Sequence, residues 1–396
     1  MKKLLQINTN VGWNATGHLA EALGCAAMDA GWRSFIAYGR DMDGTPLSAS
    51  SLLKIGSRAD VYRHGLLTRL RDRHGLGSLD ATADLVRRID MIEPDVIHLH
   101  NLHGYYLNYP ELFGYLARID RPVVWTLHDC WAFTGHCAYF SLAGCDRWKS
   151  GCHSCPLKKT YPASLLADNS AVNHELKKHT FSTVARLHLV AVSDRLREVI
   201  GESFLNRYPV QTIYNSVSVP RLNKPKALKP TVLAVASNWD FRKGLQYIIA
   251  LRKHLPENIH IRIIGLSPGQ IASLPAGCTG LPRINEREKL FGEFTAATVF
   301  INPSLAETLS MVNLEALSCG TPVVAFDSGG MHETVTPETG IIVPTGDVEA
   351  LAQGILEILE HPQRFPADAC RNLINEKFSP EHTLARYLQL YESILN

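Results

Sequence analysis

The stretch from Phe300 to Gly330 places the strongest constraint on what this chain can fold into. It opens with a short apolar run that an Asn-Pro-Ser triplet ends, continues with apolar residues at helical spacing, and closes with the run TPVVAF. The glycine and proline of the intervening CGTP segment stop the helix before that last run. The pattern therefore predicts a strand, a loop, a helix and a second buried strand, which is the repeating unit of an α/β sheet.

Two carboxylates belong to this unit, Glu307 in the predicted loop and Glu315 inside the predicted helix. A rise of 1.5 Å per residue would separate them by about 12 Å, whereas paired glycosidase carboxyls lie roughly 5 to 9.5 Å apart. This spacing suits two ends of one long ligand, with two solvated glutamates beside an amphipathic helix as the alternative. The free N–H groups of the helix start suit a phosphate; they belong to Leu309, Ser310, Met311 and Val312.

The same stretch, E-x7-E followed by LSCGTPVVAFDSGG, resembles the donor-site signature of family 4 retaining glycosyltransferases. The resemblance implies an α/β protein of the GT-B fold, with two Rossmann-like domains facing across a cleft and a C-terminal helix crossing back to the first domain. It implies that Glu315 holds the ribose hydroxyls of a nucleoside diphosphate sugar and that Glu307 holds the hydroxyls of the transferred sugar. It also implies that catalysis needs no cofactor, metal included.

Length and composition agree with such a protein. A chain of 396 residues, 45% of them hydrophobic, predicts two domains with full cores. The net charge of +2 does not indicate a nucleic-acid partner. No apolar run reaches the roughly 18 residues of a membrane span, and Gln6 and Asn8 interrupt the run after the N-terminal lysines. We therefore expect a cytoplasmic protein whose nine cysteines are mostly reduced.

Alternating strand and helix patterns organise the chain into four parts. We expect an acceptor-side Rossmann-like domain over residues 1–215 and a linker over 216–229, rich in proline and lysine. A nucleotide-sugar-binding domain follows over 230–378. The final segment, 379–396, resembles the GT-B tail helix that packs on the first domain.

Two positions in the first domain are candidate site residues. The loop after the strand KLLQIN holds Gly17, and in the family a glycine of this loop approaches the acceptor and the donor phosphate. The strand PVVWTLHD ends at His128, which matches the active-site histidine near the donor sugar. No clear nucleophile is visible, which favours same-face attack by the acceptor, with Asp129 as the alternative nucleophile.

An insert over about residues 130–160 concentrates cysteines: Cys137, Cys145, Cys152 and Cys155. In a reduced protein this spacing favours a structural zinc site with four thiolate ligands, and His136 and His153 are further candidates. A redox pair, disulfides and packing thiols are the alternatives.

The segments HLHNLHGYYLN, WTLHDCWAFTGHCAYF and GCDRWKSGCHSCP resemble the exopolysaccharide branch of the family, of the colanic-acid type. That branch implies a glycan or lipid-linked saccharide acceptor. The stretch Arg58–Arg73 is basic and partly amphipathic, so it is a candidate for peripheral contact with anionic lipid at the inner membrane face, unless it is simply a solvated face.

In the second domain, Arg242 and Lys243 follow the strand TVLAVAS and precede a helix, where two cations suit a diphosphate. The family usually has Gly-Arg just before this loop, whereas this chain has Ser237-Asn238, so Arg242 is the candidate for the missing guanidinium. Gly265 follows the next strand, where the family often lines its nucleobase pocket.

Together these features predict a retaining glycosyltransferase that moves a hexose from a UDP- or GDP-sugar to a saccharide acceptor. A nucleotide-sugar epimerase or phosphorylase on the same fold is the nearest alternative. A zinc-knuckle binding protein with a vestigial sugar site is the alternative of another class.

Overall fold

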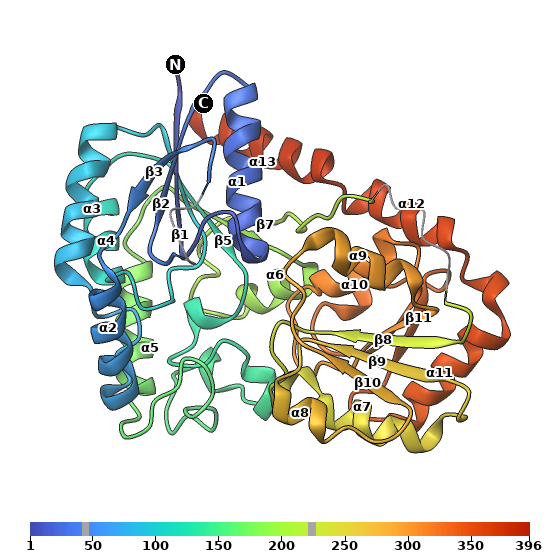
Figure 1. Cartoon of the computed structure of the whole chain (residues 1–396). Coiled ribbons are helices and arrows are strands. Elements are labelled where there is room, and N and C mark those ends of the chain that lie inside the picture. Colours follow the sequence, from blue (N-terminus) through green and yellow to red (C-terminus); the bar gives the residue numbers. More distant parts are fainter. Residues whose placement is uncertain (42–46, 221–226) are drawn as a thin grey trace. The chain divides into compact units, whose positions relative to one another are not determined.

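The computed structural model describes residues 1–41, 47–220 and 227–396. It contains two compact units (Figure 1), one formed by Met1–Ile213 with Leu384–Asn396 and the other by Tyr214–Thr383. The expected linker 216–229 begins inside the second unit, and its residues 221–226 lie outside the described residues.

The first unit is built on a seven-stranded parallel sheet in the order β3-β2-β1-β4-β5-β6-β7. Near-continuous apolar strands allow burial on both faces, which parallel sheets require. The order reverses between β1 and β4, and the loops after those strands therefore flank a crevice at their carboxyl ends. The strands are β1 Lys3–Asn8, β2 Arg33–Tyr38, β3 Ser51–Lys54, β4 Val96–Leu99, β5 Val123–Leu127, β6 Leu187–Ala191 and β7 Val210–Thr212.

Helices cover both sides of this sheet (Figure 1). They are α1 Asn14–Asp29, α2 Arg58–Arg71, α3 Leu79–Ile92, α4 Tyr109–Leu116, α5 Ser170–Phe181 and α6 Asp194–Gly201. The cysteine-rich insert after β5 contains short 3-10 turns at Trp131–Phe133, Phe140–Ala143 and Arg147–Lys149.

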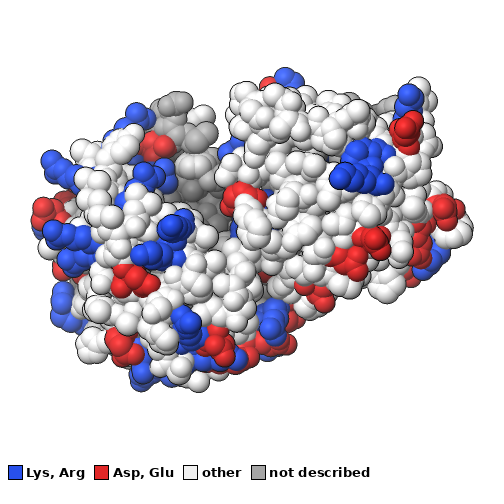
Figure 2. All heavy atoms as spheres, turned by 90° about the horizontal axis from the view of Figure 1, so that it is seen from below, with Lys and Arg blue, Asp and Glu red and all other residues white. Residues whose placement is uncertain are grey.

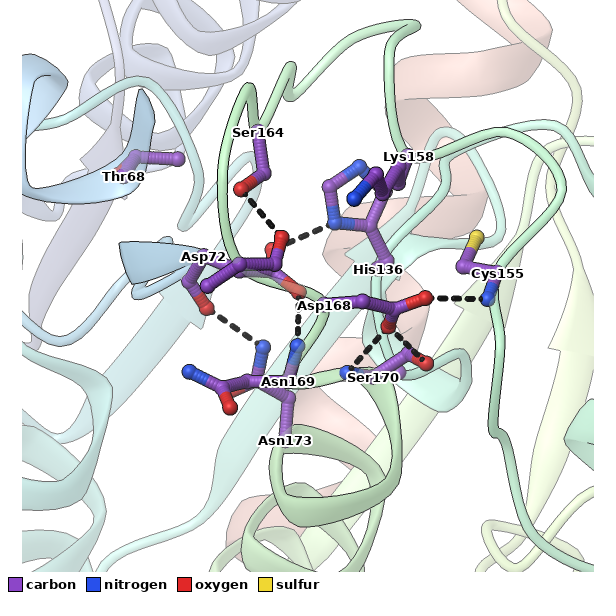
Figure 3. A network of polar contacts seen from close by, with 12 residues as sticks. Thr68, Asp72, His136, Cys155, Lys158, Ser164, Asp168, Asn169, Ser170 and Asn173 are labelled. Atoms are coloured by element: carbon purple, nitrogen blue, oxygen red, sulfur yellow. Dashed lines mark hydrogen bonds and ion pairs between the residues drawn. The ribbon is translucent and has the colours of Figure 1, made fainter. Parts of the chain in front are cut away.

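Helix α5 begins at Ser170. Asp72 Oδ2 accepts a hydrogen bond from Asn169 N at 2.8 Å, and Asp168 Oδ1 accepts one from Ser170 N at 3.0 Å (Figure 3). Because these carboxylates bind the N–H groups that open the helix, they set its first turn.

The second unit holds a six-stranded sheet in the order β10-β9-β8-β11-β12-β13, with all pairs parallel. Its order reverses between β8 and β11, which places the loops after those strands at a ligand crevice. The strands are β8 Thr231–Val235, β9 His260–Ile264, β10 Cys278–Leu281, β11 Val299–Asn302, β12 Val323–Phe326 and β13 Gly340–Val343. The helices are α7 Leu245–Leu251, α8 Pro268–Ala272, α9 Arg287–Ala296, α10 Met311–Ser318, α11 Val348–Glu360 and α12 Ala367–Lys377.

The last helix, α13 (Pro380–Leu395), starts in the second unit and continues into the first from Leu384 onward. Its Tyr387 and Tyr391 are fully buried in a core cluster that contains Val96 of β4 and Val124 of β5. The chain's C-terminal residues therefore complete the core of the N-terminal unit.

Candidate functional site

In the second unit the loops after β8 and β11 pack directly against each other. Leu305 N donates to Arg242 O at 2.8 Å. Gly244 has a φ of 78°, and a Cβ placed on it would lie 2.1 Å from Pro303 O. A side chain at Gly244 would therefore collide with the backbone of the β11 loop, and glycine permits this approach.

Arg242 and Lys243 converge on one carboxylate in this crevice. Arg242 Nη1 donates to Ala306 O at 2.9 Å and to Glu307 Oε1 at 3.1 Å. Lys243 forms an ion pair with the same Glu307 oxygen. The Glu307 side chain is 8% exposed and both cations are 18% exposed. Two cations on one carboxylate leave a net positive charge in a largely buried cluster.

The ionisation of Glu307 follows from this arrangement. Burial raises the pKa of the Glu307 carboxyl, but the charges of Lys243 and then Arg242 outweigh burial, so the pKa lies below its usual value. The carboxylate is therefore ionised at neutral pH and can accept hydrogen bonds from hydroxyl groups.

A glycine pair after β12 clamps the Glu307 backbone. A Cβ on Gly329 would lie 1.7 Å from Glu307 O, and Gly330 N donates to that oxygen at 3.4 Å. A Gly-Gly pair directly after a buried strand is the sequence signal of such a close approach.

The start of α10 differs in detail from the prediction. The helix begins at Met311, with Ser310 as its N-cap, and Ser310 Oγ accepts from Asn313 N at 3.3 Å. Leu309 and Ser310 therefore precede the helix. Met311 and Val312 form its first turn, where backbone N–H groups lack a partner within the helix.

Asn302, at the end of β11, fixes the position of this helix start through side-chain hydrogen bonds. Its Nδ2 donates to Ser310 Oγ and to Asn313 Oδ1, both at 2.8 Å, and its Oδ1 accepts from Ser304 Oγ at 2.7 Å. All of these side chains are buried, so a satisfied polar network holds the loop and the helix together. Our sequence analysis treated Asn302 as a strand end and missed this role.

Glu315 is partly buried in α10. Burial raises the pKa of its carboxyl to about 7, although Arg287 opposes the shift. Near neutral pH the group is therefore close to half protonated, in contrast to the fully ionised Glu307.

Gly265, at the end of β9, adopts a φ of 99°, and a Cβ there would lie 1.7 Å from Ala236 O. The residue lets the loops after β8 and β9 meet, and Trp239 Nε1 donates to the neighbouring Ile264 O at 2.9 Å. The sequence-predicted contact of Gly265 with a nucleobase stays a prediction.

In the first unit His128 follows β5 directly. Its Nε2 lies 3.4 Å from His100 Nδ1. Burial lowers the pKa of His128 to about 4, although Asp129 opposes the shift. The imidazole is therefore neutral at physiological pH.

Asp129 forms a partly buried pair with His103. Asp129 Oδ2 lies 2.8 Å from His103 Nε2, and Asp129 Oδ1 accepts from Trp131 N at 2.9 Å. Burial raises the pKa of Asp129, but His103 and the hydrogen bonds outweigh it, so the net shift is downward. These contacts hold the carboxylate in place and reduce its basicity. Our sequence analysis did not foresee this pairing.

His98, which precedes His100 on the same strand face, belongs to the core. Its Nδ1 lies 2.6 Å from Tyr391 OH of α13, and its Nε2 lies 2.8 Å from Thr126 Oγ1. The sequence does not distinguish the role of His98 from that of His100, because Tyr391, the partner of His98, lies 293 positions away along the chain.

Gly17 lies in the first turn of α1 and packs on its own loop. A Cβ there would lie 2.2 Å from Asn10 Oδ1, and Gly17 O accepts from Gly12 N at 3.3 Å. The structure thus explains a glycine at this position by packing, and its contact with a phosphate stays a prediction.

The predicted zinc ligands gather around one cavity of the insert. The cavity is lined by Cys137, Cys145, Cys152 and Cys155 together with His136 and His153. The four cysteines are free thiols. Within residues 1–41, 47–220 and 227–396, no group of three or more His, Cys, Asp or Glu side chains is arranged to hold a metal ion as it stands.

The stretch Arg58–Arg73 forms α2 and its C-cap, with Tyr62, Leu66 and Leu70 exposed on the surface. Figure 2 shows Lys and Arg side chains spread over the part of the surface that the first unit presents from below, with Asp and Glu between them. Across the described residues, we find no helix with the length and apolar character that a membrane span requires.

Two Rossmann-like parallel sheets, each with candidate site residues at the carboxyl ends of its strands, are the arrangement of the GT-B fold. Solved structures share this fold over the whole chain. Sucrose-phosphate synthase from Thermosynechococcus elongatus has a TM-score of 0.71 at 19% identity, covering 100% of this chain and 99% of that one. Anabaena Alr3699/HepE in complex with UDP-glucose has a TM-score of 0.66 at 15% identity, covering 99% and 100%. The expected fold class is confirmed.

Sequence comparison then identifies the family. The description "Glycosyltransferase Family 4" matches residues 20–221, and "Glycosyl transferases group 1" matches residues 229–361. The chain belongs to glycosyltransferase family 4, as the resemblance predicted, and it is a glycosyltransferase. Alpha-maltose-1-phosphate synthase of Mycobacterium tuberculosis H37Rv is 34% identical over 362 residues, 81% of this chain and 85% of its own length. The "Putative colanic acid biosynthesis glycosyl transferase WcaC" of Escherichia coli K12 is 25% identical over 377 residues, covering 88% and 89%.

Proposed function

We propose that this glycosyltransferase moves a hexose, with retention of configuration, from a UDP- or GDP-sugar to a glycan or lipid-linked saccharide of exopolysaccharide synthesis. The observation that carries the proposal is the cluster of Arg242 and Lys243 on the ionised Glu307. The similarity to WcaC supports the acceptor class. The similarity in fold to HepE, which was solved with UDP-glucose, supports the donor class.

The donor half of the reaction follows from the charges of the second unit. As the bond between the anomeric carbon and the phosphate oxygen breaks, negative charge grows on the leaving diphosphate. Arg242, Lys243 and the first turn of α10 stabilise that charge. Glu307 accepts hydrogen bonds from the hydroxyls of the transferred sugar, and Glu315 accepts those of the ribose. Hydrogen bonds from the ribose hydroxyls favour the ionised form of Glu315. Binding of the nucleotide sugar therefore lowers the pKa of Glu315 and counteracts part of the increase that burial causes.

The first unit supplies the groups for the other half. His128 is neutral at physiological pH, so its ring and carbonyl stabilise the positive charge that develops on the sugar and add no like charge. Asp129 is engaged by His103 and by Trp131 N, which makes it a poor nucleophile. Same-face attack by the acceptor hydroxyl, whose proton passes to the departing phosphate, therefore fits better than a covalent intermediate.

The exposed side of α2 is the proposed contact with a membrane that carries a lipid-linked acceptor. Tyr62, Leu66 and Leu70 can enter the interface while Arg63 and Arg69 meet anionic headgroups. Such a contact would hold the enzyme on the inner face of a membrane without a spanning segment.

Nucleotide release tests the reaction class. The chain is incubated with UDP- and GDP-sugars, with and without saccharide acceptors, and free nucleoside diphosphate and product are measured. We expect release with one donor that rises strongly when an acceptor is added, and an axial-to-axial or equatorial-to-equatorial outcome by NMR of the new anomeric proton. A donor sugar epimerised without acceptor would indicate an epimerase, and an inverted product would refute retention.

A further inference from the structure

The cavity of the cysteine-rich insert belongs to the first unit, whereas the cation–carboxylate cluster belongs to the second. We call it the thiol cavity. Its walls carry four free thiols and two imidazoles, and neither the proposed transfer nor the family assignment accounts for them. The lining residues with metal-binding side chains are His136, Cys137, Cys145, Cys152, His153 and Cys155.

Backbone N–H groups already point at two of the sulfur atoms. Gly135 N donates to Cys152 Sγ at 3.2 Å, and Leu157 N donates to Cys155 Sγ. A Cβ on Gly135 would lie 2.7 Å from Cys152 Cβ, so glycine permits this approach. Backbone N–H groups of this kind orient the sulfur ligands of a metal ion.

Two carboxylates, the buried Asp72 and the exposed Asp168, anchor the backbone around the thiols (Figure 3). His136 Nδ1 lies 2.5 Å from Asp72 Oδ1, with both side chains almost fully buried, and this contact fixes the position of the adjacent Cys137. Asp168 Oδ2 accepts from Cys155 N at 2.7 Å. Anchoring the ligand-bearing backbone before an ion arrives reduces the entropy cost of binding.

We propose that the thiol cavity binds one structural zinc ion through the thiolates of Cys137, Cys145, Cys152 and Cys155. Four thiolates are a standard ligand set for tetrahedral Zn²⁺, with Zn–S distances of about 2.3 Å. The buried Lys177 donates to Thr134 O in the wall of this cavity at 3.0 Å, so its amine lies beside the proposed centre.

Binding requires small rotations of these side chains. Cys137 and Cys155 hydrogen-bond to each other, and the thiols do not meet at one point as they stand. Because metal binding releases the thiol protons, the ion would replace this thiol–thiol contact with two metal–sulfur bonds. Cys145, Cys152 and Cys155 are only half-buried, which leaves them room to turn.

Such an ion would secure the loop that follows the candidate site. The insert begins directly after His128 and Asp129, and Lys177 Nζ already donates to Trp131 O at 2.6 Å and to Thr134 O at 3.0 Å. A zinc centre would tie the rest of the insert to this same point and so keep the wall beside His128 in place.

Metal analysis of the full chain tests the proposal. The chain, purified under reducing conditions without a histidine tag, is assayed for zinc by elemental analysis and for free thiols by titration. We expect one zinc ion per chain in the wild type, loss of zinc in Cys145→Ser and Cys152→Ser, and full zinc content in Cys25→Ser and Cys278→Ser, which lie outside the cavity and are equally half-buried.

Replacement of zinc by Co²⁺ gives a second readout that does not depend on how well the variants fold. A wild-type chain should show the intense visible absorption of tetrahedral cobalt with thiolate-to-metal charge transfer. Absence of both zinc and this spectrum would overturn the proposal. It would also be overturned if the intact mass were lower by two hydrogens per cysteine pair, because that loss indicates disulfides. Loss of zinc in His136→Gln with retention in Cys145→Ser would refute the four-thiolate set, because His136 Nε2 is buried without a hydrogen-bond partner among the described residues.

Discussion

Replacing Glu307 by alanine removes the carboxylate on which Arg242 and Lys243 converge. Breaking a buried ion pair by removing one partner costs about 3 to 5 kcal/mol. Because both cations keep 18% exposure and can recruit water, we expect the lower end, about 3 kcal/mol. The second unit has the size of a single domain, so this loss should lower its Tm by roughly 6 to 12 °C.

The loss of transfer activity should be larger than the loss of stability can explain. A hydrogen bond from a neutral donor to a charged acceptor contributes about 1.5 to 3 kcal/mol. If Glu307 holds one sugar hydroxyl in the transition state, kcat/KM should fall about 10- to 150-fold at a temperature where the variant is fully folded. Disturbed positions of Arg242 and Lys243 would add to this loss.

The assay is nucleotide release with donor and acceptor at 25 °C, combined with thermal unfolding followed by circular dichroism. Glu360→Gln, an exposed glutamate at the end of α11, is the matched control and should change neither quantity. Because the pKa of Glu307 is lowered in the folded chain, its stabilisation is present above the usual carboxyl value and is lost as the pH falls through the folded-state pKa. The Tm difference between wild type and Glu307→Ala should therefore shrink below about pH 4.5. A variant with unchanged kcat/KM would refute the assigned role.

Three further predictions address other parts of the chain. Burial raises the pKa of Glu315 to about 7, so this residue destabilises the fold progressively as the pH rises from the usual carboxyl value of 4.5 to about 7. Glu315→Gln should remove that decline in Tm and should abolish the increase in Tm that the donor nucleotide causes. An unchanged increase in Tm with the nucleotide would contradict the ribose contact. Asn302→Ala should lower stability by about 1 to 3 kcal/mol in urea titration, because it removes the donor to the buried Ser310 Oγ and Asn313 Oδ1; a cost below about 0.5 kcal/mol would show that the network relaxes. Arg63→Glu with Leu66→Glu should abolish co-sedimentation with vesicles that contain anionic lipid while leaving transfer to a soluble acceptor unchanged; equal binding of wild type to neutral vesicles would count against the proposed surface.

Short-range patterns carried much of the fold. Apolar runs of strand length, helix-period apolar positions and the CGTP stop signal report local backbone preferences, so the strand–loop–helix–strand unit from Phe300 to Gly330 could be predicted apart from the first residues of its helix. The spacing of Glu307 and Glu315 is likewise local, which is why the family resemblance could be recognised from it.

Predictions that needed a distant partner were less complete. Local patterns do not mark the start of α5, because Asp72, roughly a hundred residues upstream, binds the N–H group of Asn169 just before its first turn. The roles of the histidines in and after β4 could not be predicted, because His98 contacts Tyr391 of α13 and His103 contacts Asp129 in the loop after β5.

The sequence by itself determined the α/β class, the family and the positions of the two glutamates, because periodicity, turn residues and motif spacing act within a few residues of one another. Only the tertiary structure decided that Arg242 and Lys243 share the Glu307 carboxylate, that Gly329 presses on the same loop, and that the insert's thiols line one cavity. These contacts join segments that only the strand order brings together. Burial and charge at those meeting points then set the ionisation of each group, which no local pattern encodes.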